Sequence, residues 1–414
     1  MNKLVRVART QQHNVGVVAT ILMLVLIARL TLYPSPGPLP SGFKTCVLCG
    51  TYGLADFIDN VILFVPLGFA LRLTGLRRRT AWLITLGMAI GIETAQDWVV
   101  SGRESGLTDL ISNPLGGAIG IALTDGRRLL IAPGATAATR LTRAATMALL
   151  AFTVCLTWCL RLSIPRTGAY WTQVRSELHQ FVPFDGEILS ATIDGRPVRN
   201  GRVDDAPIRS GLRNSTIRLG ANVIPHASSD RLAPLITVFD QWQNEILVLG
   251  CRRGRVVFRA RTRTQILRVH PVSFETADGC TVGDTSTIAV EPLARGARVQ
   301  LGAVTIGTGV WLGWRLLVPD DGWWSDLAPE FTILWMAMLL APLAYWAARA
   351  DRERGVGRAS RALTWIAAVL ALTLLAIPLI AGSTPAPMSA WLGAITGAAV
   401  GWILAQWDRS TITL

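Results

Sequence analysis

Long apolar stretches constrain this chain more than any other feature of its sequence. A helix needs about 17–25 mostly apolar residues to cross the hydrocarbon core of a bilayer. Eight stretches of that kind are predicted as membrane spans: 15–33, 56–74, 80–100, 108–124, 144–162, 327–348, 362–381 and 389–407. Only 16% of the 414 residues are charged, whereas soluble domains carry roughly 25%. The sequence therefore predicts an α-helical polytopic membrane protein.

Arginine-rich loops set the predicted orientation. The net charge of +13 would suggest a nucleic-acid partner in a soluble chain. Here, however, the arginines gather in every second loop, as at 77–79, 127–143 and 349–361. By the positive-inside rule, both termini are then cytoplasmic, and we expect no nucleic-acid partner. The first stretch could instead be a signal peptide, but no small-x-small cleavage motif follows it, so we expect it to remain a helix.

Polar residues interrupt the second, third and fourth apolar stretches. They are Asp56, Asp59 and Asn60, then Glu93 and Gln96, then Asp109 and Asn113. Asp59 and Asn60 follow Asp56 by three and four residues, Gln96 follows Glu93 by three, and Asn113 follows Asp109 by four, so each set shares one helix face. A charged side chain facing lipid would cost about 2.5–3.5 kcal/mol near the bilayer centre. We therefore expect the three faces to meet in one polar cluster, which the predicted orientation places in the outer leaflet with the loop residue Arg103.

The sequence allows three interpretations of this polar cluster: catalysis, a purely structural role, and transport. Asp59, Glu93 and Asp109 are candidate catalytic carboxyls, because burial and neighbouring charges tune carboxyl groups for acid and base chemistry. The carboxylates would otherwise only pair with Arg103 and the amides and lock the helices together. Transport is disfavoured, since the inner halves of these helices are apolar. We expect no cofactor and no metal.

Proline and glycine shape the same helices. Pro66 lies inside the second stretch, and membrane helices tolerate such a proline because neighbouring groups satisfy the freed carbonyl. Gly116 and Gly120 form a GxxxG pattern, which lets two helices approach closely. We interpret these residues as packing features.

Four of the six cysteines are disulfide candidates. Cys46 and Cys49 form a CxxC pattern in the first outer loop, for which a disulfide or two free thiols is favoured over redox catalysis or half a zinc site. Cys251 and Cys280 are the only cysteines of residues 165–321, and we predict that they are bonded. Cys155 and Cys159 are expected to be packing residues.

In residues 165–321, short runs of alternating apolar and polar residues replace the long apolar stretches. This pattern predicts an inserted all-β sandwich or jelly roll outside the membrane. The sequence predicts a hairpin over 187–198 with its turn at Asp194-Gly195, and further strands at 215–224, 234–240, 244–250, 255–261, 285–292, 297–307 and 310–318. The turn CRRG joins the strands at 244–250 and 255–261.

An arginine-rich hairpin and a group of tryptophans in and just after this region are candidates for contact with a ligand or with the membrane. Six arginines lie in one hairpin: Arg252, Arg253, Arg255, Arg259, Arg261 and Arg263. Alternation places the last three on one strand face, either as a solvated face or as a contact for anionic lipid or acidic polysaccharide. Trp311, Trp314, Trp323 and Trp324 are predicted to form an interfacial belt.

The first four stretches resemble the VanZ-like family of bacterial membrane proteins. The resemblance rests on Asp59-Asn60 with FVPLGF at 64–69, on ETAQ at 93–96, on Arg103, and on DLISN at 109–113 followed by Gly116 and Gly120. On its strand pattern and the stretch at 234–258, the β region looks like a concanavalin A-like (laminin G-type) sandwich. The resemblance implies sugar or protein binding and, in some such domains, calcium binding, for which Asp240 and Asn244 are candidates but do not form a convincing set. The expected domains are 1–143 (VanZ-like), 144–164 (a membrane helix), 165–321 (β) and 327–414 (three helices).

The resemblance implies a multi-pass protein of the bacterial inner (cytoplasmic) membrane. The family is named for a protein linked to resistance to a glycopeptide antibiotic. The first functional hypothesis is an envelope protein that contacts membrane lipid and binds a lipid-linked or surface glycan at the outer leaflet. The second is a membrane-embedded enzyme whose outer carboxylates act on a lipid-linked glycan or a phospholipid head group.

Overall fold

The computed structural model describes residues 2–34, 43–101, 105–165, 168–176, 181–214, 216–293, 296–299, 304–319, 323–353 and 359–407. It forms two compact units, which meet in sequence at Thr139 and Arg140. The first unit holds the N-terminal helices, and the second holds the β domain and most of the later helices.

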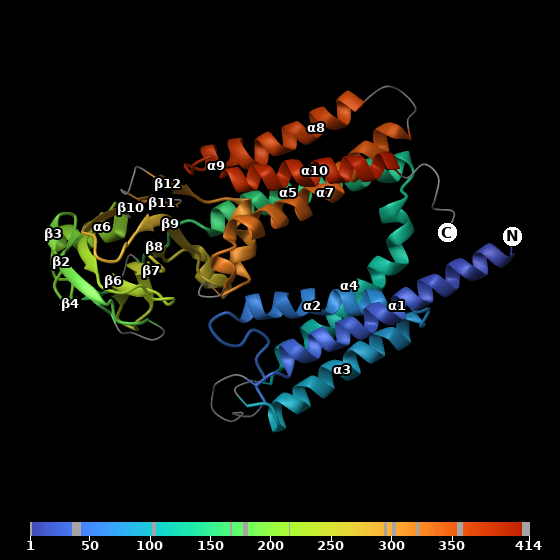
Figure 1. Ribbon diagram of the computed structural model, residues 1–414, viewed down its shortest axis with the longest axis horizontal. Coiled ribbons are helices and arrows are strands. Elements are labelled where there is room, and N and C mark those ends of the chain that lie inside the picture. Colours follow the sequence, from blue (N-terminus) through green and yellow to red (C-terminus); the bar gives the residue numbers. More distant parts are fainter. Residues whose placement is uncertain are drawn as a thin grey trace. The chain divides into compact units, whose positions relative to one another are not determined.

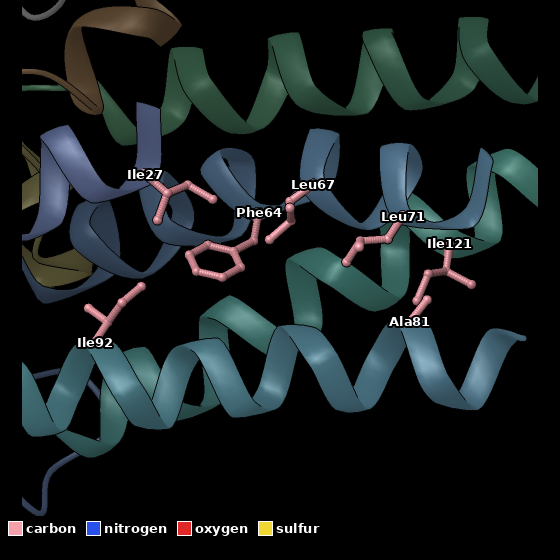
Figure 2. Close-up of a cluster of buried hydrophobic side chains, with 7 residues drawn as sticks. All are labelled: Ile27, Phe64, Leu67, Leu71, Ala81, Ile92 and Ile121. Atoms are coloured by element: carbon pink, nitrogen blue, oxygen red, sulfur yellow. The ribbon is translucent and has the colours of Figure 1, made fainter. Parts of the chain in front are cut away.

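The first unit is a bundle of four helices: α1 (Asn2–Thr31), α2 (Gly53–Leu73), α3 (Arg78–Trp98) and α4 (Leu107–Ile131) (Figure 1). Figure 2 shows the apolar side chains that these helices direct toward one another: Ile27, Phe64, Leu67, Leu71, Ala81, Ile92 and Ile121. Phe64 and Leu67 of α2 are fully buried in this cluster. The bundle therefore has an apolar core of its own along α2.

Glycine lets α2 and α4 touch through their backbones. A Cβ atom at Gly120 would lie 2.0 Å from the carbonyl oxygen of Val65, and one at Gly116 would lie 2.3 Å from that of Val61. No side chain fits such a gap, so the close approach predicted from the GxxxG pattern is confirmed. Pro66 lies inside α2 without ending the helix, as predicted.

Six helices are long and apolar enough to cross a membrane by length and composition, within the described residues: Thr10–Thr31, Gly53–Leu73, Ala135–Cys159, Ala328–Arg352, Arg361–Ile380 and Met388–Trp407. The remaining two predicted spans form α3 and α4, but polar residues lower their mean hydropathy. The chain is thus a helical membrane protein, while membrane crossing by α3 and α4 stays a prediction.

The later helices are α5 (Ala135–Cys159), α7 (Ala328–Arg352), α8 (Ala359–Ala371) and α10 (Met388–Trp407). A π-helical turn (Leu372–Ala376) and α9 (Ile377–Ile380) continue α8. Glycines again set a helix contact, because Cβ atoms at Gly393, Gly397 and Gly401 of α10 would lie 2.1–2.4 Å from carbonyl oxygens of α7. This repeat of glycines at every fourth residue was not predicted from the sequence. In α5, Cys159 is buried and Cys155 is exposed.

The β domain consists of two antiparallel six-stranded sheets. One has the order β4-β1-β6-β7-β8-β9 and the other β12-β11-β10-β5-β2-β3. The strands are β1 (Tyr170–Val174), β2 (Gly186–Ile193), β3 (Arg196–Pro197), β4 (Gly201–Arg202), β5 (Leu219–Pro225), β6 (Ala233–Asp240), β7 (Glu245–Arg252), β8 (Arg255–Ala260), β9 (Ser273–Gly279), β10 (Ser286–Leu293), β11 (Gly296–Val299) and β12 (Val304–Gly307). The inner faces are buried, as at Val223, Leu235 and Val248. The inserted all-β fold is therefore present, as predicted.

The predicted hairpin turns are confirmed. Asp194 and Gly195 join β2 to β3 with φ values of 50° and 75°. Arg253 and Gly254 join β7 to β8 with φ values of 51° and 76°. A positive φ at both turn positions matches the right-handed twist of the flanking strands. The sequence analysis missed β1, β9 and the helix α6 (Ala206–Asn214).

The predicted strand at 310–318 is wrong. Val310–Leu316 forms a 3-10 helix, and Trp311 and Trp314 in it are buried rather than facing an interfacial belt. The Trp314 ring stacks on Phe331 of α7 at 5.4 Å, and its Nε1 donates to Thr332. Because large apolar side chains point to several sides of this segment, a helical turn buries more of them than a flat strand would. The segment fixes the β domain to α7.

Candidate functional site

A pocket of about 660 Å³ opens in the first unit where α1 and α3 end and α2 and α4 begin. The polar part of its lining is mostly carboxyl and amide side chains, namely Asp56, Asp59, Asn60, Gln96 and Asp109, together with one cation, Lys44. Leu30, Ile62 and Leu63 add an apolar part. The i, i+3, i+4 spacing of α2 turns Asp56, Asp59 and Asn60 toward this space. We call it the acidic pocket.

Direct hydrogen bonds link the three helices beneath the acidic pocket. Asn60 Nδ2 donates to Asp109 Oδ1 at 2.7 Å, which ties α2 to α4. The backbone N–H of Gly106 donates to Glu93 Oε2 at 2.6 Å, which ties the start of α4 to α3. The Asp109 carboxyl also lies beside that of Glu93. A buried carboxyl and one that lines the pocket are thus neighbours, an arrangement that suits proton transfer as well as ligand binding.

A short loop frames one side of the acidic pocket. The backbone of Lys44 pairs with the segment before α4, since Lys44 N donates to Ser105 O and Leu107 N donates to Lys44 O. Thr108 Oγ1 donates to Val47 O at 2.7 Å. Cys46 and Cys49 of this loop are joined by a disulfide. The sequence analysis did not find Lys44 as a pocket residue. Its isolation as one of two lysines among 40 basic residues was the only available signal.

Several polar atoms buried beside the pocket have no hydrogen-bond partner among the described residues. They are Glu93 Oε1, Gln96 Oε1, Ser112 Oγ and Asn113 Oδ1. The other end of the Gln96 amide is satisfied, because Nε2 donates to Thr31 O at 2.9 Å. A buried acceptor left unpaired costs about 1–3 kcal/mol. Four such atoms lie close together on α3 and α4, where the described protein groups do not satisfy them.

The structure brings the predicted polar residues of α2, α3 and α4 to one end of the bundle. Asp56, Asp59, Asn60, Gln96 and Asp109 line the acidic pocket. Glu93 and Asn113 lie just beneath, each at least 95% buried. Arg103 falls outside the described residues, so the predicted pairing of the carboxylates with Arg103 stays a prediction.

In the β domain, the arginine-rich hairpin is neither a solvated face nor a free basic patch. Arg252 and Arg255 pair with Glu275, Arg253 pairs with Asp230 and Asp326, Arg259 pairs with Glu245, and Arg261 pairs with Asp240. Arg252 and Arg259 are buried. Only Arg259 of the last three arginines lies in β8, so the predicted shared strand face is wrong. Arg263 stacks over Trp158 instead. These arginines stabilise the fold and leave little charge for an anionic ligand.

The carboxylate of Asp240 accepts hydrogen bonds from neighbouring protein groups and is not arranged as a calcium ligand. Burial raises the pKa of Asp240, but hydrogen bonds from the Asn244 side chain and backbone, the Trp242 backbone and Arg261 outweigh this and lower its pKa overall. No group of three or more His, Cys, Asp or Glu side chains suited to a metal occurs within the described ranges. Cys251 and Cys280 are joined by a disulfide, beside a smaller pocket of about 400 Å³.

The residues that form the acidic pocket lie within a range that matches a known protein family. Residues 17–128, about a quarter of the chain, match the family model described as VanZ/LLP1. This range holds most of the four-helix bundle and every residue predicted for the polar cluster. No curated protein matches the chain, and no solved structure does. The chain is therefore a multi-pass membrane protein with a VanZ-like domain in its N-terminal part and a β domain inserted further along.

Proposed function

We propose that this protein binds a lipid-linked or surface glycan in the acidic pocket, at the outer leaflet of the bacterial inner membrane. Both termini are cytoplasmic in this proposal and the β domain is extracytoplasmic, as the arginine-rich loops favour. By occupying or redistributing such a glycan, the protein would alter the composition of the envelope and its susceptibility to glycopeptide antibiotics.

The acceptor-rich lining of the pocket carries the proposal. The carboxylates of Asp56 and Asp59 line the pocket and can only accept hydrogen bonds, so a complementary ligand must donate several. Sugar hydroxyls do this, and carboxylates bind them with charge-assisted hydrogen bonds. A volume of about 660 Å³ accommodates one or two sugar rings. Lys44, which also lines the pocket, places one positive charge near a lipid-linked phosphate in this proposal.

A second candidate function follows from the adjacent carboxyls of Glu93 and Asp109. A pair of neighbouring carboxyl groups separates into an acid and a base, which general acid–base chemistry on a head group requires. Incubating the purified full chain with lipid-linked glycans and phospholipids distinguishes the two functions. A product that wild type forms and Glu93→Gln does not form supports an enzyme. Ligand retained unchanged by both supports binding alone.

The cellular experiment uses a strain lacking the protein, complemented with wild type, Asp59→Asn or Arg128→Gln at matched membrane levels. Arg128 lies on α4 far from the acidic pocket and serves as the control. The proposal expects Asp59→Asn to resemble the empty strain in glycopeptide susceptibility and in its profile of lipid-linked glycans. If Asp59→Asn behaves as wild type in both readouts, the pocket is not the functional site.

A further inference from the structure

A second pocket of the four-helix bundle lies at the opposite end from the acidic pocket. It has a volume of about 710 Å³ and is lined by Arg78, Arg79, Trp82, Leu83, Ala118, Ile121, Ala122, Asp125 and Gly126. Asp109 and Asp125 are sixteen residues apart on α4, which corresponds to roughly 24 Å along the helix. The two pockets therefore lie about 24 Å apart along the bundle, and the acidic pocket does not explain this one.

The lining of this groove divides along the helix axes. Trp82 and Leu83 on α3 face Ala118, Ile121 and Ala122 on α4, and these form an apolar wall. One turn toward the start of α3, and one turn toward the end of α4, the lining becomes charged. A Cβ atom at Gly126 would meet nothing within 4 Å, so the groove stays open at its charged end. An apolar channel with a charged mouth matches an amphiphile rather than a water-soluble ligand.

The charge at the mouth is positive. Asp125 accepts from Arg72 at 2.8 Å and from Arg78 at 2.8 Å, so one carboxylate balances only one of these two guanidinium groups. Arg79 adds another guanidinium, and no ion pair of Arg79 occurs within the part of the chain that the structure describes. Arginine is the preferred partner of phosphate, because its planar fork donates two parallel hydrogen bonds.

We propose that this groove binds an anionic phospholipid. Arg79 and the free donors of Arg78 would hold the phosphate, and Trp82, Leu83, Ala118 and Ala122 would hold one acyl chain. Basic pockets between membrane helices recognise acidic head groups in this way. The proposal is independent of the glycan function, since it uses none of the residues of the acidic pocket.

The test measures lipid affinity of the full chain in nanodiscs by native mass spectrometry. The probes are dioleoyl phosphatidylglycerol and dioleoyl phosphatidylcholine, which share acyl chains and differ in charge. Wild type should retain phosphatidylglycerol about tenfold better than phosphatidylcholine. Arg79→Gln should weaken phosphatidylglycerol binding about fivefold to tenfold, and Ala122→Trp, which fills the groove, should weaken it as much.

Matched controls separate the groove from general attraction to negative lipid. Arg128→Gln removes one charge at the same end of α4 without lining the groove, and Leu123→Trp adds a ring at an exposed neighbouring position. Both should bind as wild type does. Equal retention of the two lipids by wild type overturns the proposal. So does equal weakening by Arg128→Gln and Arg79→Gln, or unchanged binding by Ala122→Trp in a protein that remains monodisperse.

Discussion

At the scale of single residues, some polar side chains in and beside the acidic pocket have hydrogen-bond partners and others do not. Asn60 and Asp109 are paired across α2 and α4. Gln96 Oε1 and Asn113 Oδ1 are buried without partners among the described residues. A fold that only needed stability would avoid such atoms, because each costs about 1–3 kcal/mol. The paired residues hold the frame, and the unpaired atoms lie buried next to it.

Replacing Asn60 tests the frame. Asn60→Asp replaces the donor to Asp109 by a second acceptor and places like charges 2.7 Å apart. We expect a loss of about 1–3 kcal/mol in the free energy of unfolding, measured by denaturation in mixed micelles. Asp59→Asn, on the same helix face, should leave stability within about 0.5 kcal/mol. If Asn60→Asp were as stable as wild type, the hydrogen bond would not be a frame contact.

Asp240 gives the β domain a defined pH dependence. Its folded-state pKa lies below the usual value of 3.8, so its hydrogen bonds stabilise the fold above that pH and are lost as pH falls through the lower folded pKa. The difference in Tm between wild type and Asp240→Asn should be constant above about pH 5 and should shrink below about pH 4. Asp284→Asn, at an exposed turn, is the control and should show no such trend. A difference that grows on acidification would contradict the assigned sign.

At the scale of elements, glycine spacing decides which helices touch. Gly116 and Gly120 bring α4 onto α2, and Gly393, Gly397 and Gly401 bring α10 onto α7. The core in Figure 2 then closes around α2. These contacts depend on the absence of a side chain, so single methyl groups are strong probes of them.

Adding one methyl group at Gly120 should separate α2 from α4. Gly120→Ala places a Cβ 2.0 Å from Val65 O, and relieving this overlap should cost about 1–3 kcal/mol of stability. Gly87→Ala is the matched control, because a Cβ there meets nothing within 4 Å. Unfolding of both variants in detergent gives the comparison. Equal stability of the two variants would contradict the close packing of α2 and α4.

The elements also show how far a sequence can be interpreted. Helix periodicity placed Asp56, Asp59 and Asn60 on one face, and turn residues located the hairpins at Asp194-Gly195 and Arg253-Gly254. Local sequence patterns could not predict contacts between segments that lie far apart in the chain. The 3-10 helix at Val310–Leu316 depends on Phe331 and Thr332, and the ion pairs of the arginine-rich hairpin depend on Glu275 and Asp240. Lys44 reaches the pocket only through its backbone pairing with Gly106.

At the scale of the whole molecule, the proposed orientation can be tested at two exposed positions. Asp284→Cys lies on a turn of the β domain, and Glu353→Cys lies at the end of α7 within the arginine-rich loop. In spheroplasts, a membrane-impermeant maleimide should label Asp284→Cys at once and Glu353→Cys only after permeabilisation. Wild type gives the background from Cys155 and Cys159. The reverse pattern would place the β domain and the acidic pocket on the other side.

The central claim is that the acidic pocket holds a glycan. The most direct measurement is mass spectrometry of lipids that copurify with the full chain from native membranes, comparing wild type, the double variant Asp56→Asn with Asp59→Asn, and Arg128→Gln. We expect wild type and Arg128→Gln to carry a sugar-bearing lipid in near-stoichiometric amount. The double variant should bind it about thirtyfold more weakly, because each Asn still accepts a hydrogen bond and loses only the charge, which is about 1 kcal/mol per group. The same sugar-bearing lipid at equal levels in all three proteins, or in none, would contradict the claim.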